Sequence, residues 1–446
     1  MQVKKEKGNT LLKAVLKSKW YPGVFQIPVL IVFAFITYEL FFGPASAHQN
    51  FGTALTWILW WPLIPLVFLM FGRFWCAICP FATVSDFIQK VVGNNRPVPN
   101  FLKKYGIWII DIFFILITWG DHVFGIVESP LGSGVMMMII ATGVITAGAF
   151  FERRTWCRYL CFLGGVAGNY SRAGAVELRG TAEKCSRCTV MACYRGGDKA
   201  PGCPMFEFPK AMDNNARCNL CGYCVKNCPN DSITIAARMP SKELWFIRNP
   251  KYEESFLAIV IMGIVFVQNI TMLAIWEKAQ AWLEMILGTH QYAVTFTVTF
   301  LVAMAIPVAL LYMSSWQASR SNEESVNKNF ARFGYSLIPL DLAGHMAHNL
   351  FHLLAEGKAI LYTGMAAAGM GVSNQSAALV STGTIQILQY VLLAAGAFGS
   401  VYTAYRIAKN NYSTKVLNSA LPFIVLIIVL TLANVYFFML PMTHRM

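Results

Sequence analysis

The chain has 446 residues, of which 56% are hydrophobic and only 13% are charged, and its formal net charge is +14. Soluble domains average about 45–50% apolar and about 25% charged residues, so this composition excludes an ordinary soluble protein and indicates a polytopic membrane protein. The excess of basic residues does not indicate nucleic-acid binding, because these residues lie mostly in loops between apolar segments and no base-reading motif is present.

Apolar segments long enough to cross the roughly 30 Å hydrocarbon core of a bilayer recur along the chain. The first follows a basic N-terminal segment, and it is too long for a signal peptide and lacks a small-residue cleavage site. We expect nine transmembrane helices, four before the main cysteine-rich stretch and five after it. Their predicted ranges are 25–42, 54–71, 107–119, 134–151, 256–275, 292–313, 338–354, 385–405 and 421–440.

The charges of the loops predict the orientation of these helices. Lysines and arginines gather in alternate loops, and the positive-inside rule places such loops in the cytoplasm. The basic loops contain Lys90, Arg96, Lys103, Lys104, Arg153, Arg154, Arg158, Arg320, Lys328, Arg332, Arg406, Lys409 and Lys415. We therefore expect a protein of the bacterial cytoplasmic (inner) membrane with its N-terminus in the cytoplasm and its C-terminus in the periplasm.

The second and fourth predicted helices end in similar sequences, RFWCAIC at residues 73–79 and RTWCRYLC at residues 154–161. The similarity predicts a duplicated helical hairpin, which would bring two cysteine pairs to the same membrane depth. These cysteines are Cys76, Cys79, Cys157 and Cys161. Plain burial of free cysteines is one interpretation. Among chemical roles, a third iron–sulfur cluster or another metal site is favoured over a thiol–disulfide couple.

Eight more cysteines lie between residues 185 and 228. Residues 218–229 read CNLCGYCVKNCP, the spacing with which bacterial ferredoxins hold cubane 4Fe–4S clusters, and in that arrangement the fourth cysteine binds the other cluster. One predicted cluster therefore has the ligands Cys185, Cys188, Cys193 and Cys228. The other has Cys203, Cys218, Cys221 and Cys224. A zinc site is the alternative. So many thiolates also indicate a reducing compartment, the cytoplasm.

These motifs together resemble the NapH/NosR family of membrane iron–sulfur proteins over about residues 20–235, with NapH-like members the closer match. The resemblance implies electron transfer at the membrane, usually linked to the quinone pool and a periplasmic respiratory enzyme. The family pattern is C-x3-C-P at both hairpins. Here the first pair is spaced C-x2-C-P, and Phe162 stands where the second proline would be.

The seventh predicted helix lies outside the part that resembles this family, and it carries a polar stripe at positions i, i+4, i+7, i+11 and i+15. The stripe consists of Asp341, His345, His348, His352 and Glu356. Ionisable groups inside a membrane are costly, so the stripe indicates function. A b-type haem could use a stripe histidine with His290 or His122. A quinone or proton site could use Asp341, His345, His348 and Glu356. A non-haem metal and a helix without any cofactor are the remaining interpretations.

The predicted fold class is a polytopic α-helical membrane protein with an inserted cytoplasmic ferredoxin domain that holds two 4Fe–4S clusters. Its parts are a basic N-terminus (1–22), a four-helix module (23–175), the ferredoxin domain (176–240) and a five-helix module (250–446). We expect an electron-transfer subunit, without catalytic residues of its own, between the quinone pool or a cytoplasmic donor and a periplasmic redox partner. A maturation factor for a metal-containing respiratory enzyme and a redox-linked ion-pump subunit are the alternatives.

Overall fold

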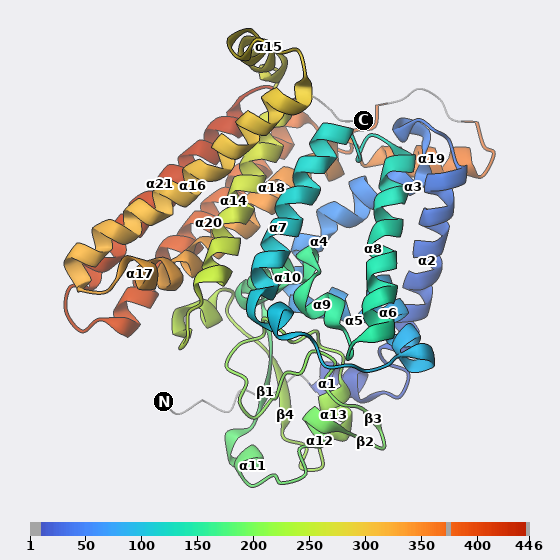
Figure 1. Ribbon diagram of the computed structural model, residues 1–446, viewed down its shortest axis with the longest axis vertical. Helices are drawn as coiled ribbons and strands as arrows, with labels where there is room; N and C mark the ends of the chain where they lie inside the picture. Colours follow the sequence, from blue (N-terminus) through green and yellow to red (C-terminus); the bar gives the residue numbers. More distant parts are fainter. Residues whose placement is uncertain (1–9, 372–375, 443–446) are drawn as a thin grey trace. The chain divides into compact units, whose positions relative to one another are not determined.

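The computed structural model describes residues 10–371 and 376–442 and is almost entirely helical (Figure 1). The chain folds into two compact units. Unit 1 comprises the described residues up to 34 together with 67–110 and 139–243. Unit 2 comprises 35–66, 111–138 and the described residues from 244 onward. Residues 35–66 and 111–138, which the sequence assigns to the four-helix module, thus group with the C-terminal helices.

Eight helical segments of the described chain are long and apolar enough to cross a membrane, and each coincides with a predicted span. They are α2 (Gly23–Phe42), the broken segment Phe51–Val92, α7 (Asn100–Phe124), α8 (Pro130–Phe150), α14 (Tyr252–Thr271), α16 (Tyr292–Asn322), α20 (Thr382–Asn411) and α21 (Val416–Met439). Eight of the roughly nine predicted spans are therefore matched by helices of this length and hydropathy among the described residues.

The remaining predicted span forms α18 (Ile338–Ala355), which is not among the eight. Most of its residues are buried inside unit 2, where it packs chiefly against α20 and also against α14. An aspartate and three histidines lower its hydropathy, and burial within protein spares these groups the cost of contact with lipid.

The helical segment Phe51–Val92 is broken into several parts, and glycine and proline explain two of the breaks. Its parts are α3 (Phe51–Thr53), a π-helical stretch (Ala54–Trp60), α4 (Trp61–Phe71), a 3-10 turn (Gly72–Phe74), α5 (Trp75–Ile78) and α6 (Pro80–Val92). Gly72 has a φ of +58°, in the left-handed region that suits glycine, and it ends α4. Pro80 begins α6 after an extended Cys79.

The second hairpin repeats this design. After α8, Arg154 takes the left-handed conformation, and α9 (Thr155–Tyr159) carries the Trp-Cys pair. Cys161 then caps α10 (Phe162–Ala173) and accepts a hydrogen bond from the Gly164 N–H at 3.3 Å. In both hairpins the first cysteine lies in a short helix and the second at the N-cap of the next.

The remaining part of unit 1 holds the ferredoxin stretch on a small framework. Its elements are β1 (Val176–Gly180), α11 (Ala182–Ser186), α12 (Ala192–Arg195), β2 (Gly196–Gly197), β3 (Ala200–Pro201), α13 (Tyr223–Asn227) and β4 (Ile233–Ala237). Strands β1 and β4 pair antiparallel, and β2 pairs antiparallel with β3. Leu178 and Ile235 face each other in the first ladder and are both buried in its core.

Helix α1 (Thr10–Lys17) packs on this framework through Leu16, a contact the sequence did not predict. Lys13 Nζ and Lys17 Nζ lie 3.0 and 2.9 Å from the two carboxylate oxygens of Asp231. Hydrogen bonds from Lys17 and Lys13 lower the pKa of the Asp231 carboxyl to about 2.

We expect Asp231→Asn to lower stability at pH 7 by less than about 1 kcal/mol, because this ion pair is exposed to solvent. A carboxyl whose pKa is lowered by folding contributes stability above its unfolded pKa of about 4 and loses it as pH falls toward about 2. The difference in Tm between variant and wild type, measured by thermal melts, should therefore be equal at pH 7 and pH 5. A difference that already vanishes at pH 5 would contradict the assigned ion pair.

The C-terminal part of unit 2 is a bundle. Besides α14, α16, α18, α20 and α21, it contains α15 (Trp276–Leu287), α17 (Val326–Phe333) and α19 (Lys358–Ala367). Its core is aromatic and aliphatic, and the rings of Phe333 and Phe423 stack with centroids 4.1 Å apart. This bundle holds the polar stripe of α18 in place.

Candidate metal centres

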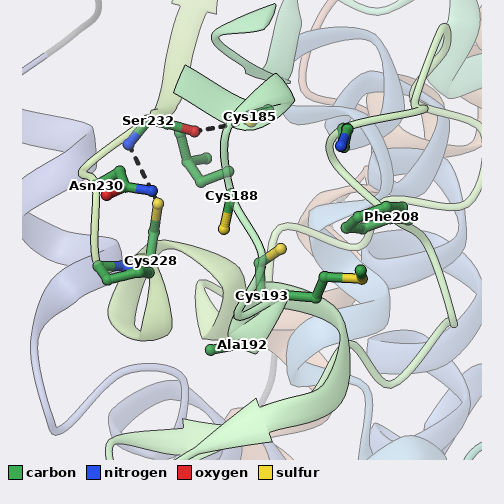
Figure 2. Close-up of a pocket in the computed structure, with 12 residues that line it drawn as sticks. Cys185, Cys188, Ala192, Cys193, Phe208, Cys228, Asn230 and Ser232 are labelled. Atoms are coloured by element: carbon green, nitrogen blue, oxygen red, sulfur yellow. Dashed lines mark hydrogen bonds between the residues drawn. The ribbon is translucent and has the colours of Figure 1, made fainter. Parts of the chain in front are cut away.

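One set of predicted ligands lines a single pocket of unit 1. We call Cys185, Cys188, Cys193 and Cys228 cysteine group I. Figure 2 shows the sulfurs of Cys188, Cys193 and Cys228 directed toward a common space beside Cys185. Ser232 contacts two of these cysteines. Its hydroxyl lies 3.0 Å from Cys185 Sγ, and its backbone N–H donates a hydrogen bond to Cys228 Sγ at 3.2 Å. Hydrogen bonds to cysteine sulfur tune the potential of a bound cluster.

The second set of predicted ligands also gathers within unit 1. We call Cys203, Cys218, Cys221 and Cys224 cysteine group II. Burial, and after it the nearby Cys203 thiol, raise the pKa of the Cys221 thiol to about 12. The pKa of Cys224 is raised by burial and then by Cys218 and Cys221. Thiols that affect one another in this way lie close together, and in the metal-free chain they are protonated. Binding of a metal cluster would release these protons.

The spacing of the thiols can be compared with the spacing that a single zinc ion requires. Four sulfurs around one zinc, with bonds of about 2.3 Å, would lie about 3.8 Å apart. Among the described residues, no three His, Cys, Asp or Glu side chains are grouped as a single metal ion requires. The cysteines of a cubane bind four different irons and are therefore spaced more widely. The metal content of the purified chain decides between zinc and iron–sulfur clusters.

The structure also brings the two hairpin pairs together. We call Cys76, Cys79, Cys157 and Cys161 the hairpin group. Burial, and after it the neighbouring Cys76 and Cys79, raise the pKa of the Cys161 thiol to about 12. The Cys157 thiol interacts with both Cys161 and Cys76. All twelve cysteines of the chain therefore fall into three groups of four, all within unit 1.

Part of the α18 stripe lines a pocket within unit 2. The pocket is lined by Trp57, Ile58, Trp61, Val127, Gln268, His348, Asn349, His352 and Glu356. His348 Nδ1 lies 2.8 Å from Asn269 Oδ1, and His352 Nδ1 lies 3.4 Å from Glu356 Oε2. The pocket therefore combines two imidazoles and a buried carboxylate with an apolar wall.

Two tryptophans of this wall were missed by the sequence analysis. Trp57 belongs to the π-helical stretch and Trp61 begins α4, where it also lies 6.0 Å from the His345 ring. Short π-helical stretches inside α-helices occur frequently at functional sites. The only signal in the sequence was the aromatic run TWILWW at residues 56–61.

The remaining predicted members do not join this pocket. The His290 side chain is 97% exposed and faces Glu284. The His122 ring stacks on Phe296, and its nitrogens lie 2.9 Å from Thr118 O and 3.2 Å from Thr271 Oγ1. Both ring nitrogens of His122 thus have polar atoms within hydrogen-bond distance, and neither His122 nor His290 lines this pocket. Asp341 is buried on α18 but is not among the lining residues.

Comparisons with known proteins agree with the cysteine geometry. Residues 53–99 and 133–178 each match the same model of a 4Fe-4S binding domain, and residues 212–234 match another 4Fe-4S binding domain model. Part of the chain is thus similar to 4Fe-4S binding domains that include the two cysteine-pair hairpins. The two matches to one model cover the two cysteine-pair hairpins, in agreement with a duplication.

Two relatives from Escherichia coli (strain K12) are similar to part of the chain. "Putative electron transport protein YccM" is 25% identical over 202 residues, which are 40% of this chain and 54% of the relative. "Ferredoxin-type protein NapH" is 21% identical over 220 residues, 44% of this chain and 72% of the relative. The chain thus spans about half the length of the first relative. No solved structure matches.

Proposed function

We propose that this chain carries electrons between the quinone pool and a periplasmic redox partner, in the bacterial cytoplasmic membrane. Iron–sulfur electron transfer itself follows from the 4Fe-4S domains and from the names of both relatives. The observation that carries the proposal is the gathering of all twelve cysteines into three groups within unit 1. The basic loops support a cytoplasmic position for the ferredoxin domain.

Cysteine group I is close to group II, and group II is close to the hairpin group, an order that suits stepwise electron transfer. The Cys193 thiol of group I contributes to the raised pKa of Cys224 in group II, after burial and the nearer thiols. Cys221 of group II packs in one cluster with Ala77 and Ile78, which lie between the two cysteines of the first hairpin. Each cubane accepts one electron, so electrons would pass singly through group I, group II and the hairpin group, in either direction.

The pocket of unit 2 is the proposed quinone site. Oxidation of one quinol to quinone releases two electrons and two protons, so the site needs a proton acceptor and two single-electron transfers. His352 and Glu356 are buried and adjacent, which suits them to accept protons, and Trp57 and Trp61 provide an apolar wall. Ionisable groups buried in a membrane protein commonly mark such paths.

We expect Glu356→Gln to slow the reduction of the clusters by a quinol analogue on the order of 10²-fold, because an amide cannot accept the proton. Stopped-flow absorbance of the clusters in the detergent-solubilised chain measures this rate, and iron content should stay unchanged.

His290→Gln is the matched control, because it alters an exposed histidine of the same unit outside the pocket. Its rate should equal that of the wild type. If Glu356→Gln also reduces at the wild-type rate, the quinone site is misassigned, although the iron–sulfur carrier function would stand.

A further inference from the structure

The two hairpins each supply half of a cluster site. The family model matches each hairpin separately, yet each hairpin contains only two cysteines, whereas a cubane needs four thiolates. We infer that the hairpin group holds one iron–sulfur cluster shared between the hairpins and clamped by Arg73 and Arg154. This inference rests on the proposed iron–sulfur carrier function and adds a third centre to the two of the ferredoxin domain.

Two arginines bind the hairpins to each other reciprocally. Arg73 lies three residues before Cys76, and its Nη2 donates to the Cys157 carbonyl oxygen at 3.1 Å. Arg154 lies three residues before Cys157, and its Nη1 donates to the Cys76 carbonyl oxygen at 2.6 Å. Each arginine therefore fixes the backbone of the first cysteine in the opposite hairpin. Reciprocal hydrogen bonds of this kind are expected when two duplicated hairpins pair with approximate two-fold symmetry.

Both guanidinium groups are buried beside the thiols. Arg73 and Arg154 are 5% and 1% exposed. The Arg73 Nε also donates to Cys76 Sγ at 3.4 Å. An oxidised 4Fe–4S core with four thiolates is a dianion, and buried cations stabilise it and also its more negative reduced form.

The second hairpin is shaped to let Arg73 approach. A Cβ added to Gly164 would lie 2.9 Å from both Arg73 Nη2 and the Cys157 carbonyl oxygen. The glycine thus leaves room for the Arg73 side chain, and its N–H donates to Cys161 Sγ. Backbone donors to sulfur are typical of cluster loops. All four cysteines of the hairpin group are free thiols in the structure.

The test is the iron and acid-labile sulfide content of the full chain, purified without air in detergent, with EPR of the reduced protein. The wild type should hold about twelve irons, four for each of three clusters. Cys79→Ala and Cys161→Ala should each hold about eight, and the double variant also about eight, because both cysteines belong to one cluster. The ferredoxin EPR signals should persist in all three.

Other outcomes separate this inference from the proposed function. A wild type with about eight irons overturns the third cluster and leaves the carrier function intact. A double variant that loses about twice as much iron as either single variant overturns the sharing. Stoichiometric copper or zinc in place of the third cluster also overturns the inference. A wild type without iron overturns the proposed function itself.

A redox titration tests the arginine clamp without changing a cysteine. Arg73→Gln should lower the reduction potential of one of the three clusters, as followed by EPR, and leave the other two potentials unchanged. Loss of a buried cation disfavours the added electron. Arg73→Lys, which keeps the charge, should restore most of that shift. If no potential moves in Arg73→Gln, the clamp is refuted.

Discussion

Cys228→Ala is expected to remove the same cluster as Cys188→Ala, although Cys224 is much closer to Cys228 in the sequence. In the two-cluster spacing the fourth cysteine crosses to the other cluster, and the structure places Cys228 in the pocket of Cys188. Each single variant should lose about four irons per chain, and the double variant Cys188→Ala/Cys228→Ala should lose no more. By contrast, Cys224→Ala/Cys228→Ala should lose about eight.

Iron and sulfide assays on anaerobically purified protein measure these losses. Ser232→Ala is the control, because it removes a hydroxyl 3.0 Å from Cys185 Sγ but keeps the N–H that donates to Cys228 Sγ. Its iron content should equal that of the wild type. If Cys188→Ala/Cys228→Ala lost about eight irons, these two cysteines would belong to different clusters and the assigned ligand sets would be wrong.

Arg154→Met is expected to destabilise unit 1 by about 3 kcal/mol. The guanidinium donates through Nε and Nη2 to both carboxylate oxygens of Asp86 and through Nη1 to the Cys76 carbonyl. Arg154 is buried, whereas the Asp86 side chain is 32% exposed, so water offsets part of the loss. Hydrogen bonds to charged groups are worth about 1.5–3 kcal/mol each. Thermal melts of the detergent-solubilised protein should show a Tm several degrees lower.

The neighbouring Arg153→Met is the matched control. Arg153 lies 4.8 Å from the centroid of the Phe206 ring, a contact worth about 0.5–1 kcal/mol. Asp86→Asn combined with Arg154→Met should regain part of the lost stability, because no unpaired carboxylate remains. Equal Tm values for Arg153→Met and Arg154→Met would show that the contacts of Arg154 between the hairpins do not contribute to stability.

The features that could be predicted from the sequence have local signatures. Long apolar runs located eight membrane helices, and cysteine spacing grouped the ferredoxin thiols into the two sets that the structure brings together. The repeat of Arg-x-Trp-Cys indicated the duplicated hairpins. Helix α18 was predicted as a ninth span, because its apolar residues outnumber its polar ones. The structure buries its polar stripe inside a bundle.

The features that could not be predicted depend on contacts between distant segments. The sequence around Trp57 does not predict the π-helical stretch. That stretch places Trp57 in the pocket with His348 and His352. The reciprocal hydrogen bonds of Arg73 and Arg154 join residues about eighty positions apart in the sequence. Hydrophobic periodicity does not predict contacts of this kind. His290 was predicted as a second haem ligand from its membrane depth, and the structure leaves its side chain exposed.

The most direct test of the central claim is the metal content of the intact chain purified without air. Iron, acid-labile sulfide and zinc should be quantified together, and EPR spectra recorded after reduction by dithionite. The account predicts about twelve irons, a matching amount of sulfide and EPR signals of reduced 4Fe–4S clusters. Zinc in place of iron, or thiols without any metal, would contradict it.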